Sequence, residues 1–250
     1  MPLLEVDGLA KSFGAIRAVQ GVSFTLDQGE ILGIIGPNGS GKTTLFNMIL
    51  GQLTPDAGRV KFEGRDITGA SPLFIAQSGI GRTFQSLQVF GSLTTRDNLI
   101  AAAQEGRGSR LGRLFGPADA GMAAQAESYV DRFRLKHVAD LKAGTLSYGQ
   151  QKLIDLAMAF VSTPSLVMLD EPAAGVNPTL VEDIRQMLEA QNAERGTTFV
   201  VIEHNMEFVM RLCHRVIVMA EGQVIAAGKP SDVQSDPQVI GAYLGEEVAR

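Results

Sequence analysis

The sequence predicts an α/β fold with a parallel sheet at its centre. Residues 31–35 form a continuous apolar run followed by a glycine-rich segment, which is typical of a strand buried on both faces. Strand-like runs return at residues 166–169 and 198–202, and a helical pattern over residues 178–193 separates them. Strand–helix–strand order usually accompanies parallel pairing, so these elements predict the central sheet.

The N-terminal part predicts shorter strands and one helix. Apolar and polar side chains alternate over residues 3–8, 22–26 and 58–68. In the last of these segments, Gly64 and Arg65 are expected to form a hairpin turn. A helix is expected from about residue 41 to residue 50, because Gly51 is a favourable residue just beyond a helix end.

The middle of the chain has a helical pattern. Helices are expected at residues 95–103, at residues 119–133 and at a segment ending with residue 161. Thr94 or Thr95 is expected to cap the first helix, which carries Asp97 in its first turn. The third helix is expected to begin at Ser147 or Tyr148.

Composition excludes several classes of protein. The 250 residues are 45% hydrophobic and 20% charged, which is too apolar for a mainly disordered chain. A formal net charge of -5 disfavours a general nucleic-acid binder, and one cysteine excludes a disulfide framework. No apolar run approaches the roughly 18 residues of a spanning helix, and no secretory signal is recognisable, so a cytosolic chain is expected.

The strongest motif follows the first buried run. Its sequence is Gly36-Pro37-Asn38-Gly39-Ser40-Gly41-Lys42-Thr43, which fits the pattern G-x-x-x-x-G-K-[S/T] between a strand and a helix. Glycines let successive backbone N–H groups turn towards an anion, and the helix start adds its positive dipole. Lys42 is expected to reach the terminal phosphates and Thr43 to ligate Mg²⁺. We therefore expect a nucleoside triphosphate site.

Two carboxylates end the strand-like run at residues 166–169. Asp170 is expected to hold Mg²⁺ through water, and Glu171 to orient and polarise the attacking water. An acidic turn seen alone is usually only solvated. Its pairing with the phosphate loop favours the functional interpretation.

The segment Thr145-Leu146-Ser147-Tyr148-Gly149-Gln150-Gln151 lies about 20 residues before Asp170. Ser147 is expected to cap a helix, and the N–H groups of Gly149 and Gln150 are expected to face an anion. Here the sequence resembles the ATP-binding subunits of ABC transporters over its whole length, with the motifs in that family's order. The Asn-Lys-x-Asp motif of G proteins is not found in the sequence.

The resemblance implies a RecA-like P-loop core with an N-terminal antiparallel β subdomain and an inserted helical (ABC-signature) subdomain. In one ABC ATP-binding domain, residues 1–85 and 162–228 would form the core with the β subdomain. Residues 86–161 would form the helical subdomain, and residues 229–250 a C-terminal tail.

The resemblance also implies roles for individual residues. Gln85 would contact Mg²⁺ or water, His204 would bond the γ-phosphate, and Phe13 would stack on adenine. A core role for Phe13 and a polar strand-end role for His204 are the alternatives. The full set of implied ATP contacts is Phe13, Gly36, Pro37, Asn38, Gly39, Ser40, Gly41, Lys42, Thr43 and Thr44. The partner subunit's ATP would contact Ser147, Tyr148, Gly149 and Gln150.

Three positions depart from the usual family pattern. Tyr148 replaces a glycine, but the flanking Ser147 and Gly149 keep the hydroxyl and the close backbone approach. Asn177 stands where the family's D-loop often has aspartate, so any role of charge there is in doubt. Lys152 replaces a frequent arginine, a difference of little consequence.

The combined motifs are similar to those of importers for branched-chain amino acids and their amide and urea relatives. The resemblance therefore implies ATP hydrolysis that powers import, with ATP and Mg²⁺ as cofactors. The alternatives are a lipopolysaccharide-type exporter and a soluble ABC ATPase. A second ABC ATPase, integral permeases and, indirectly, a periplasmic solute-binding protein are the implied partners, with no nucleic acid. The implied location is the cytoplasmic face of the bacterial inner membrane, as a peripheral protein.

Overall fold

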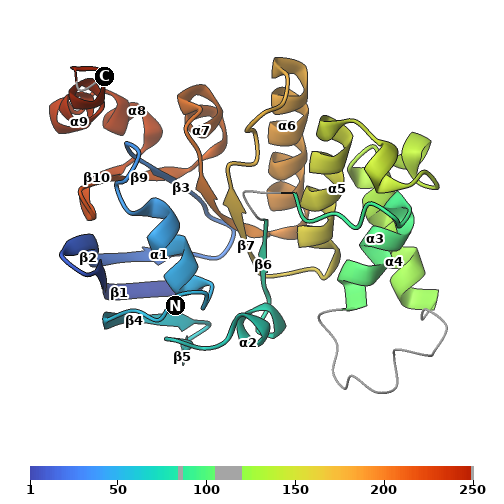
Figure 1. Cartoon of the computed structure of the whole chain (residues 1–250), viewed down its shortest axis with the longest axis horizontal. Helices are drawn as coiled ribbons and strands as arrows, with labels where there is room; N and C mark the ends of the chain where they lie inside the picture. Colours follow the sequence, from blue (N-terminus) through green and yellow to red (C-terminus); the bar gives the residue numbers. More distant parts are fainter. Residues whose placement is uncertain (84–86, 105–119, 249–250) are drawn as a thin grey trace. The chain divides into compact units, whose positions relative to one another are not determined.

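The computed structural model describes residues 1–83, 87–104 and 120–248. The chain divides into two compact units, one formed by Met1–Ile75 with Gln191–Arg250 and the other by Ala76–Ala190 (Figure 1). Within the described ranges, no helix is both long enough and apolar enough to cross a membrane.

An antiparallel sheet forms part of the first unit, as the resemblance implied. Its strands are β1 (Leu4–Phe13), β2 (Ile16–Leu26), β4 (Ala57–Phe62) and β5 (Arg65–Asp66), in the order β2-β1-β4-β5. β1 and β2 extend well beyond the alternating segments, because bulges in their pairing break the alternation that the sequence shows. The turn between β4 and β5 is Glu63 and Gly64, one residue earlier than predicted.

The parallel sheet of this unit carries the glycine-rich motif. β3 (Ile31–Ile35) pairs in parallel with β8 (Thr198–Ile202) on one side and with β9 (Arg215–Ala220) on the other. β10 (Gln223–Gly228) runs antiparallel to β9. Every residue of β3 and β8 is buried, which confirms the predicted central strands.

Helices of the first unit follow these strands. They are α1 (Lys42–Ile49), α7 (Met206–Leu212), α8 (Pro230–Gln234) and α9 (Pro237–Val248). α1 lies within the helix predicted at residues 41–50. α2 (Pro72–Gln77) and α6 (Pro178–Arg195) cross the boundaries between the two units.

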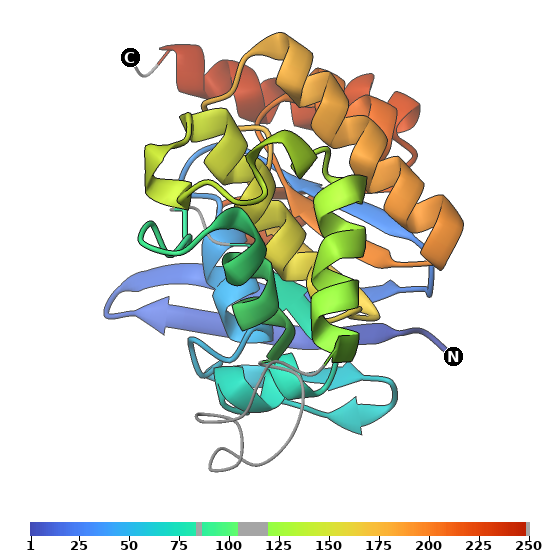
Figure 2. The same cartoon turned by 90° about the vertical axis from the view of Figure 1, so that its right-hand side faces the viewer.

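The second unit combines two strands with a helical layer. β6 (Ile80–Arg82) pairs in parallel with β7 (Leu166–Asp170). α3 (Thr95–Gln104), α4 (Ala120–Arg132) and α5 (Tyr148–Val161) pack against one another (Figure 2). Short 3₁₀ turns occur at Lys136–Val138 and Ala143–Thr145. The three predicted helices are thus confirmed, and Thr94 caps α3 by accepting from the Asp97 N–H at 3.0 Å.

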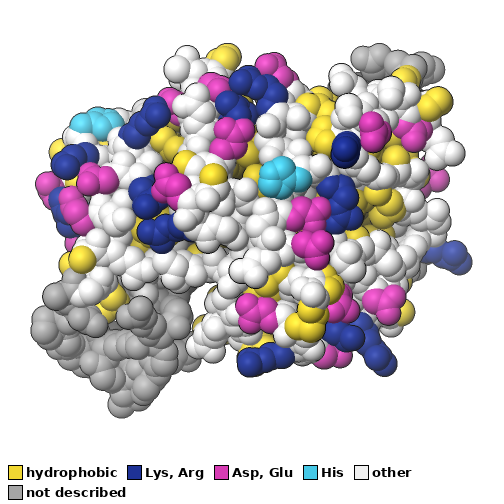
Figure 3. Space-filling view, turned by 180° about the vertical axis from the view of Figure 1, so that it is seen from behind, with side chains coloured by type: hydrophobic (Ala, Val, Ile, Leu, Met, Phe, Trp, Pro, Cys, Tyr) yellow, Lys and Arg dark blue, Asp and Glu magenta, His cyan; other side chains and the backbone are white. Residues whose placement is uncertain are grey.

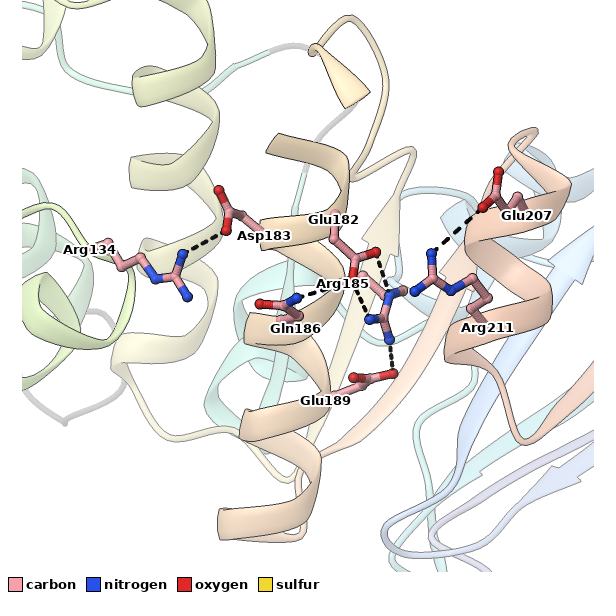
Figure 4. Close-up of polar contacts among 8 residues, drawn as sticks. All are labelled: Arg134, Glu182, Asp183, Arg185, Gln186, Glu189, Glu207 and Arg211. Carbon is pink, nitrogen blue, oxygen red and sulfur yellow. Dashed lines mark hydrogen bonds and ion pairs between the residues drawn. The ribbon is translucent and has the colours of Figure 1, made fainter. Parts of the chain in front are cut away.

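Charged side chains cover the surface of α6. Arg185 bonds Glu182 and Glu189 on the same helix (Figure 4). Arg134 reaches Asp183 at 2.6 Å. The Arg134–Asp183 pair is solvent-exposed, and such pairs contribute little to stability. On the face drawn in Figure 3, basic and acidic side chains are interspersed and apolar side chains form small patches.

Candidate functional site

The glycine-rich motif forms the turn from β3 into α1. Gly36 has φ 147° and Gly41 has φ 98°. A Cβ at Gly36 would collide with the carbonyl oxygen of Met219, and one at Gly41 with that of Ala18. Both positions therefore need glycine for conformation and for space.

Lys42 is the first residue of α1, and its side chain folds back over the loop. The ammonium donates to the carbonyl oxygens of Gly36 and Pro37, each at 2.8 Å, and lies 3.2 Å from Ser40 Oγ. The first N–H groups of a helix have no intrahelical acceptor, and Gly41 at the N-cap has no side chain to cap them. The loop thus presents a cation and a helix start together, which favours an anionic ligand.

A second segment supports this loop, and no sequence motif indicates it. The turn between β9 and β10 consists of Glu221 and Gly222. Gly222 donates its N–H to the Ser40 carbonyl at 3.1 Å and accepts from the Gln20 N–H at 2.8 Å. The Gln20 side chain also bonds the Glu221 carbonyl at 2.7 Å. β2 and the C-terminal strand pair therefore both buttress the phosphate loop.

Phe13 and His204 lie at strand ends in the same unit. Phe13 is 48% exposed, and Lys11 Nζ lies 5.9 Å from its ring centroid, so the alternative of a core phenylalanine is wrong. His204 is the second residue after β8 and is exposed. The buried Glu203 carboxylate accepts from the N–H groups of His204 at 3.1 Å and Asn205 at 3.3 Å, which fixes this turn.

The acidic strand end belongs to the second unit. Asp170 is the last residue of β7, and its N–H donates to Thr83 Oγ1 at 3.1 Å. Glu171 has φ 48°, in the left-handed region that non-glycine residues rarely adopt. Its carbonyl oxygen accepts from the Ala174 N–H at 3.2 Å and from Lys152 Nζ at 3.0 Å.

Residues 147–150, called the signature segment below, cap the start of α5. Ser147 Oγ accepts from the Gln150 N–H at 3.4 Å, while the Gln150 side chain accepts from the Ser147 N–H at 3.0 Å. This is a capping box. It corrects the prediction that the Gln150 N–H faces an anion, because the cap uses that N–H. A Cβ at Gly149 would lie 2.6 Å from Leu180 Cδ2, so the Leu180 side chain would have to move to accommodate it.

The side chains at two departures from the family pattern make defined contacts. The Tyr148 ring lies against Gly175. A Cβ added at Gly175 would be only 3.1 Å from Cε1 of that ring. Asn177 caps α6, because its Oδ1 accepts from the Leu180 N–H at 2.9 Å. Gln85, the remaining predicted site residue, lies outside the described residues.

Sequence reasoning missed two buried charges on α5. Lys152 is 1% exposed, and Asp155 is 4% exposed. Asp155 Oδ1 accepts from the Gln88 N–H at 3.2 Å, and within the described ranges Oδ2 has no hydrogen-bond partner. Burial raises the pKa of Asp155 to about 6, although the hydrogen bond from Gln88 and the charge of Lys152 act to lower it. The available sequence signal was two charged residues, three apart, in the largely apolar stretch 152–161.

A glycine-rich phosphate loop after a buried central strand, with an acidic strand end and a capped signature helix, defines an ATP-binding cassette. The chain belongs to the ABC transporter family, whose model matches residues 19–174. It is therefore an ATPase whose hydrolysis of ATP is coupled to transport. A second model, for the branched-chain amino acid ATP-binding cassette transporter, matches residues 223–249.

Individual relatives are similar over their full length. The high-affinity branched-chain amino acid transport ATP-binding protein BraF of Pseudomonas aeruginosa is 37% identical over 98% of both chains. The probable branched-chain amino acid transport ATP-binding protein LivG of Methanocaldococcus jannaschii is 39% identical, also over 98% of both.

Solved structures confirm the RecA-like ABC fold. An ABC transporter cassette in its ADP conformation matches with a TM-score of 0.88 and 39% identity, over 98% of this chain and 99% of that one. A nucleotide-free cassette matches with a TM-score of 0.87 and 37% identity, over 97% and 99%.

Proposed function

We propose that this ATPase powers the import of branched-chain amino acids or of related small amides and urea. The observation that carries this proposal is the family match at residues 223–249, which describes a branched-chain amino acid transporter. The relatives named for the same transport support it over the rest of the chain. Fold similarity alone would not distinguish this solute class from others.

In the proposed cycle, the phosphate loop binds the β- and γ-phosphates of ATP. Lys42 supplies the cation, and the N–H groups at the start of α1 supply further donors. Phe13 presents an exposed ring for adenine, and His204 contacts the γ-phosphate. The exposure of both side chains at strand ends supports these roles.

Mg²⁺ is the proposed metal cofactor, and the donor set suits it. The Thr43 hydroxyl, the Asp170 carboxylate acting through water and the Gln85 amide oxygen are all hard oxygen donors. When bound, the ion would neutralise phosphate charge. Catalysis by this chain would then depend on positioning and charge stabilisation.

Glu171 is proposed to polarise the attacking water. Glu171→Gln keeps the shape and a carbonyl oxygen but removes the charge, so turnover should fall on the order of 10²–10⁴-fold. Binding of a fluorescent ATP analogue should survive. Phosphate release at the wild-type rate would exclude Glu171 as the catalytic carboxylate, and loss of binding would indicate a structural role instead.

We further propose that two ATPase subunits sandwich two ATPs, with Ser147 and Gly149 of each facing the other's nucleotide. A dimeric bacterial ABC transporter cassette, 25% identical with a TM-score of 0.78, supports such pairing. The pair would act at the cytoplasmic face of the inner membrane on permeases served by a periplasmic binding protein. The proposed division into core, helical subdomain and tail remains a prediction.

Reconstitution tests this function directly. The chain is expressed with the permeases of its own operon, and the complex is purified from membranes. Vesicles containing the complex and ATP should accumulate radiolabelled leucine when the binding protein is supplied, whereas a Lys42→Ala complex should not. Export of the solute would favour the exporter. Failure to recover any permease with the chain would favour the soluble ATPase.

A further inference from the structure

Lys152 is a buried cation directed at the main chain of Glu171. It lies on α5, is 1% exposed, and donates from Nζ to the Glu171 carbonyl oxygen at 3.0 Å. Removing an ammonium from water is costly, so a buried lysine requires compensating contacts. A hydrogen bond from a charged donor is among the stronger ones available inside a protein.

The backbone that Lys152 contacts has an unfavourable conformation. Glu171 adopts φ 48°, which persists only where surrounding contacts enforce it. Here the carbonyl oxygen accepts from two sides, from the Ala174 N–H at 3.2 Å and from Lys152. Because the direction of this carbonyl is tied to the Glu171 backbone dihedrals, the two contacts also fix where its side chain starts.

We propose that Lys152 is a positioning residue for the catalytic carboxylate. Its ammonium holds the Glu171 backbone and thereby aims the side chain at the attacking water. The inference rests on the proposed role of Glu171. Lys152 contacts the carbonyl oxygen, so it acts through backbone geometry.

The rest of α5 supports this role. Asp155, one turn further along, gives Lys152 a nearby negative charge. Its Oδ1 accepts from the Gln88 N–H at 3.2 Å, so two buried charges fix the helix to separate chain segments. The same helix begins at the Ser147 cap. The element that positions Glu171 is therefore the one that carries the signature segment.

Steady-state ATP hydrolysis by Lys152→Met tests the inference. Since an ångström of misplacement can cost 10²-fold, kcat should fall by roughly 10- to 100-fold. KM and the affinity for a fluorescent ATP analogue should stay within about twofold. Lys152→Arg keeps a charged donor and should recover kcat to within about threefold. Lys136→Met is the control, because that side chain is 76% exposed, and it should change neither parameter.

A double-mutant cycle separates positioning from general stability. Lys152→Met should slow the wild type but leave the residual rate of Glu171→Gln unchanged, because the positioned carboxylate is already gone. Equal fold-losses in both backgrounds would overturn the inference. If Lys152→Met does not fold, Lys152→Gln runs the same cycle with the same criteria.

The catalytic role of Glu171 and the positioning role of Lys152 are refuted by different results. Normal turnover in Glu171→Gln alone would refute the catalytic role of Glu171. Normal kcat in Lys152→Met beside a slow Glu171→Gln would refute only the positioning role of Lys152.

Discussion

The titration of Asp155 makes the free energy of unfolding of this protein depend on pH. One substitution can isolate this contribution. Its pKa is raised from 3.8 to about 6, chiefly by burial. Because the folded state prefers the protonated carboxyl, this group stabilises the fold fully below about pH 4, and that stability is lost as pH rises through 6. At 1.36 kcal/mol per pKa unit, the whole loss is about 3 kcal/mol.

Asp155→Asn removes this titration while keeping an oxygen that can accept from the Gln88 N–H. Relative to the wild type, the free energy of unfolding of the variant should increase by about 1.4 kcal/mol between pH 5 and pH 8. Only this change with pH is predicted. The part of the free-energy difference that does not change with pH also includes the loss of a negative charge near Lys152.

Urea denaturation followed by circular dichroism, at pH 5, 6, 7 and 8, measures the difference. Asp140→Asn is the control for an Asp-to-Asn change at an exposed site, since that carboxylate is 83% exposed. A constant difference for Asp155→Asn across this range would show that the buried carboxyl titrates normally, and the reasoning would fail.

Three further substitutions test the nucleotide site. Lys42→Ala should abolish tight Mg-ATP binding, because the phosphates lose the loop cation; near wild-type affinity in a fluorescent-analogue titration would remove Lys42 from the site. Ser147→Arg should leave binding by the monomer intact yet block ATP-driven dimerisation. Light scattering in the Glu171→Gln background decides this, and normal dimerisation would contradict the composite site. Gly222→Ala should destabilise the protein by about 1–3 kcal/mol and weaken ATP binding, because a Cβ there would lie 2.9 Å from the Ala18 carbonyl at φ 78°. Thermal unfolding with and without ATP measures both effects.

Sequence patterns predicted the elements whose signals lie within a few neighbouring residues. The apolar run at β3 and the Ser147 cap of α5 were both found where expected, because burial on both faces and helix capping leave signals within a few residues. The β1–β2 hairpin was only partly predicted. Its bulges interrupt the alternation on which strand prediction depends.

Contacts between distant segments could not be predicted from one sequence. Nothing near Gly222 indicates that its N–H supports Ser40, because the two residues lie far apart in the chain. The residue type of Lys152 does not indicate burial either, since lysine is almost never fully buried unless it is paired. Its burial becomes apparent only once β7 supplies the carbonyl of the following Glu171 as an acceptor.

The pairing of β3 has a consequence for biosynthesis. Within its unit, both strand partners of β3 come from much later in the chain, β8 ending at Ile202 and β9 at Ala220. A ribosome therefore releases an apolar strand long before either neighbour exists, which exposes the nascent chain to aggregation. The support that Gly222 gives to the phosphate loop also arrives late. Nucleotide can therefore help fold this protein only after the segment around Gly222 has been translated.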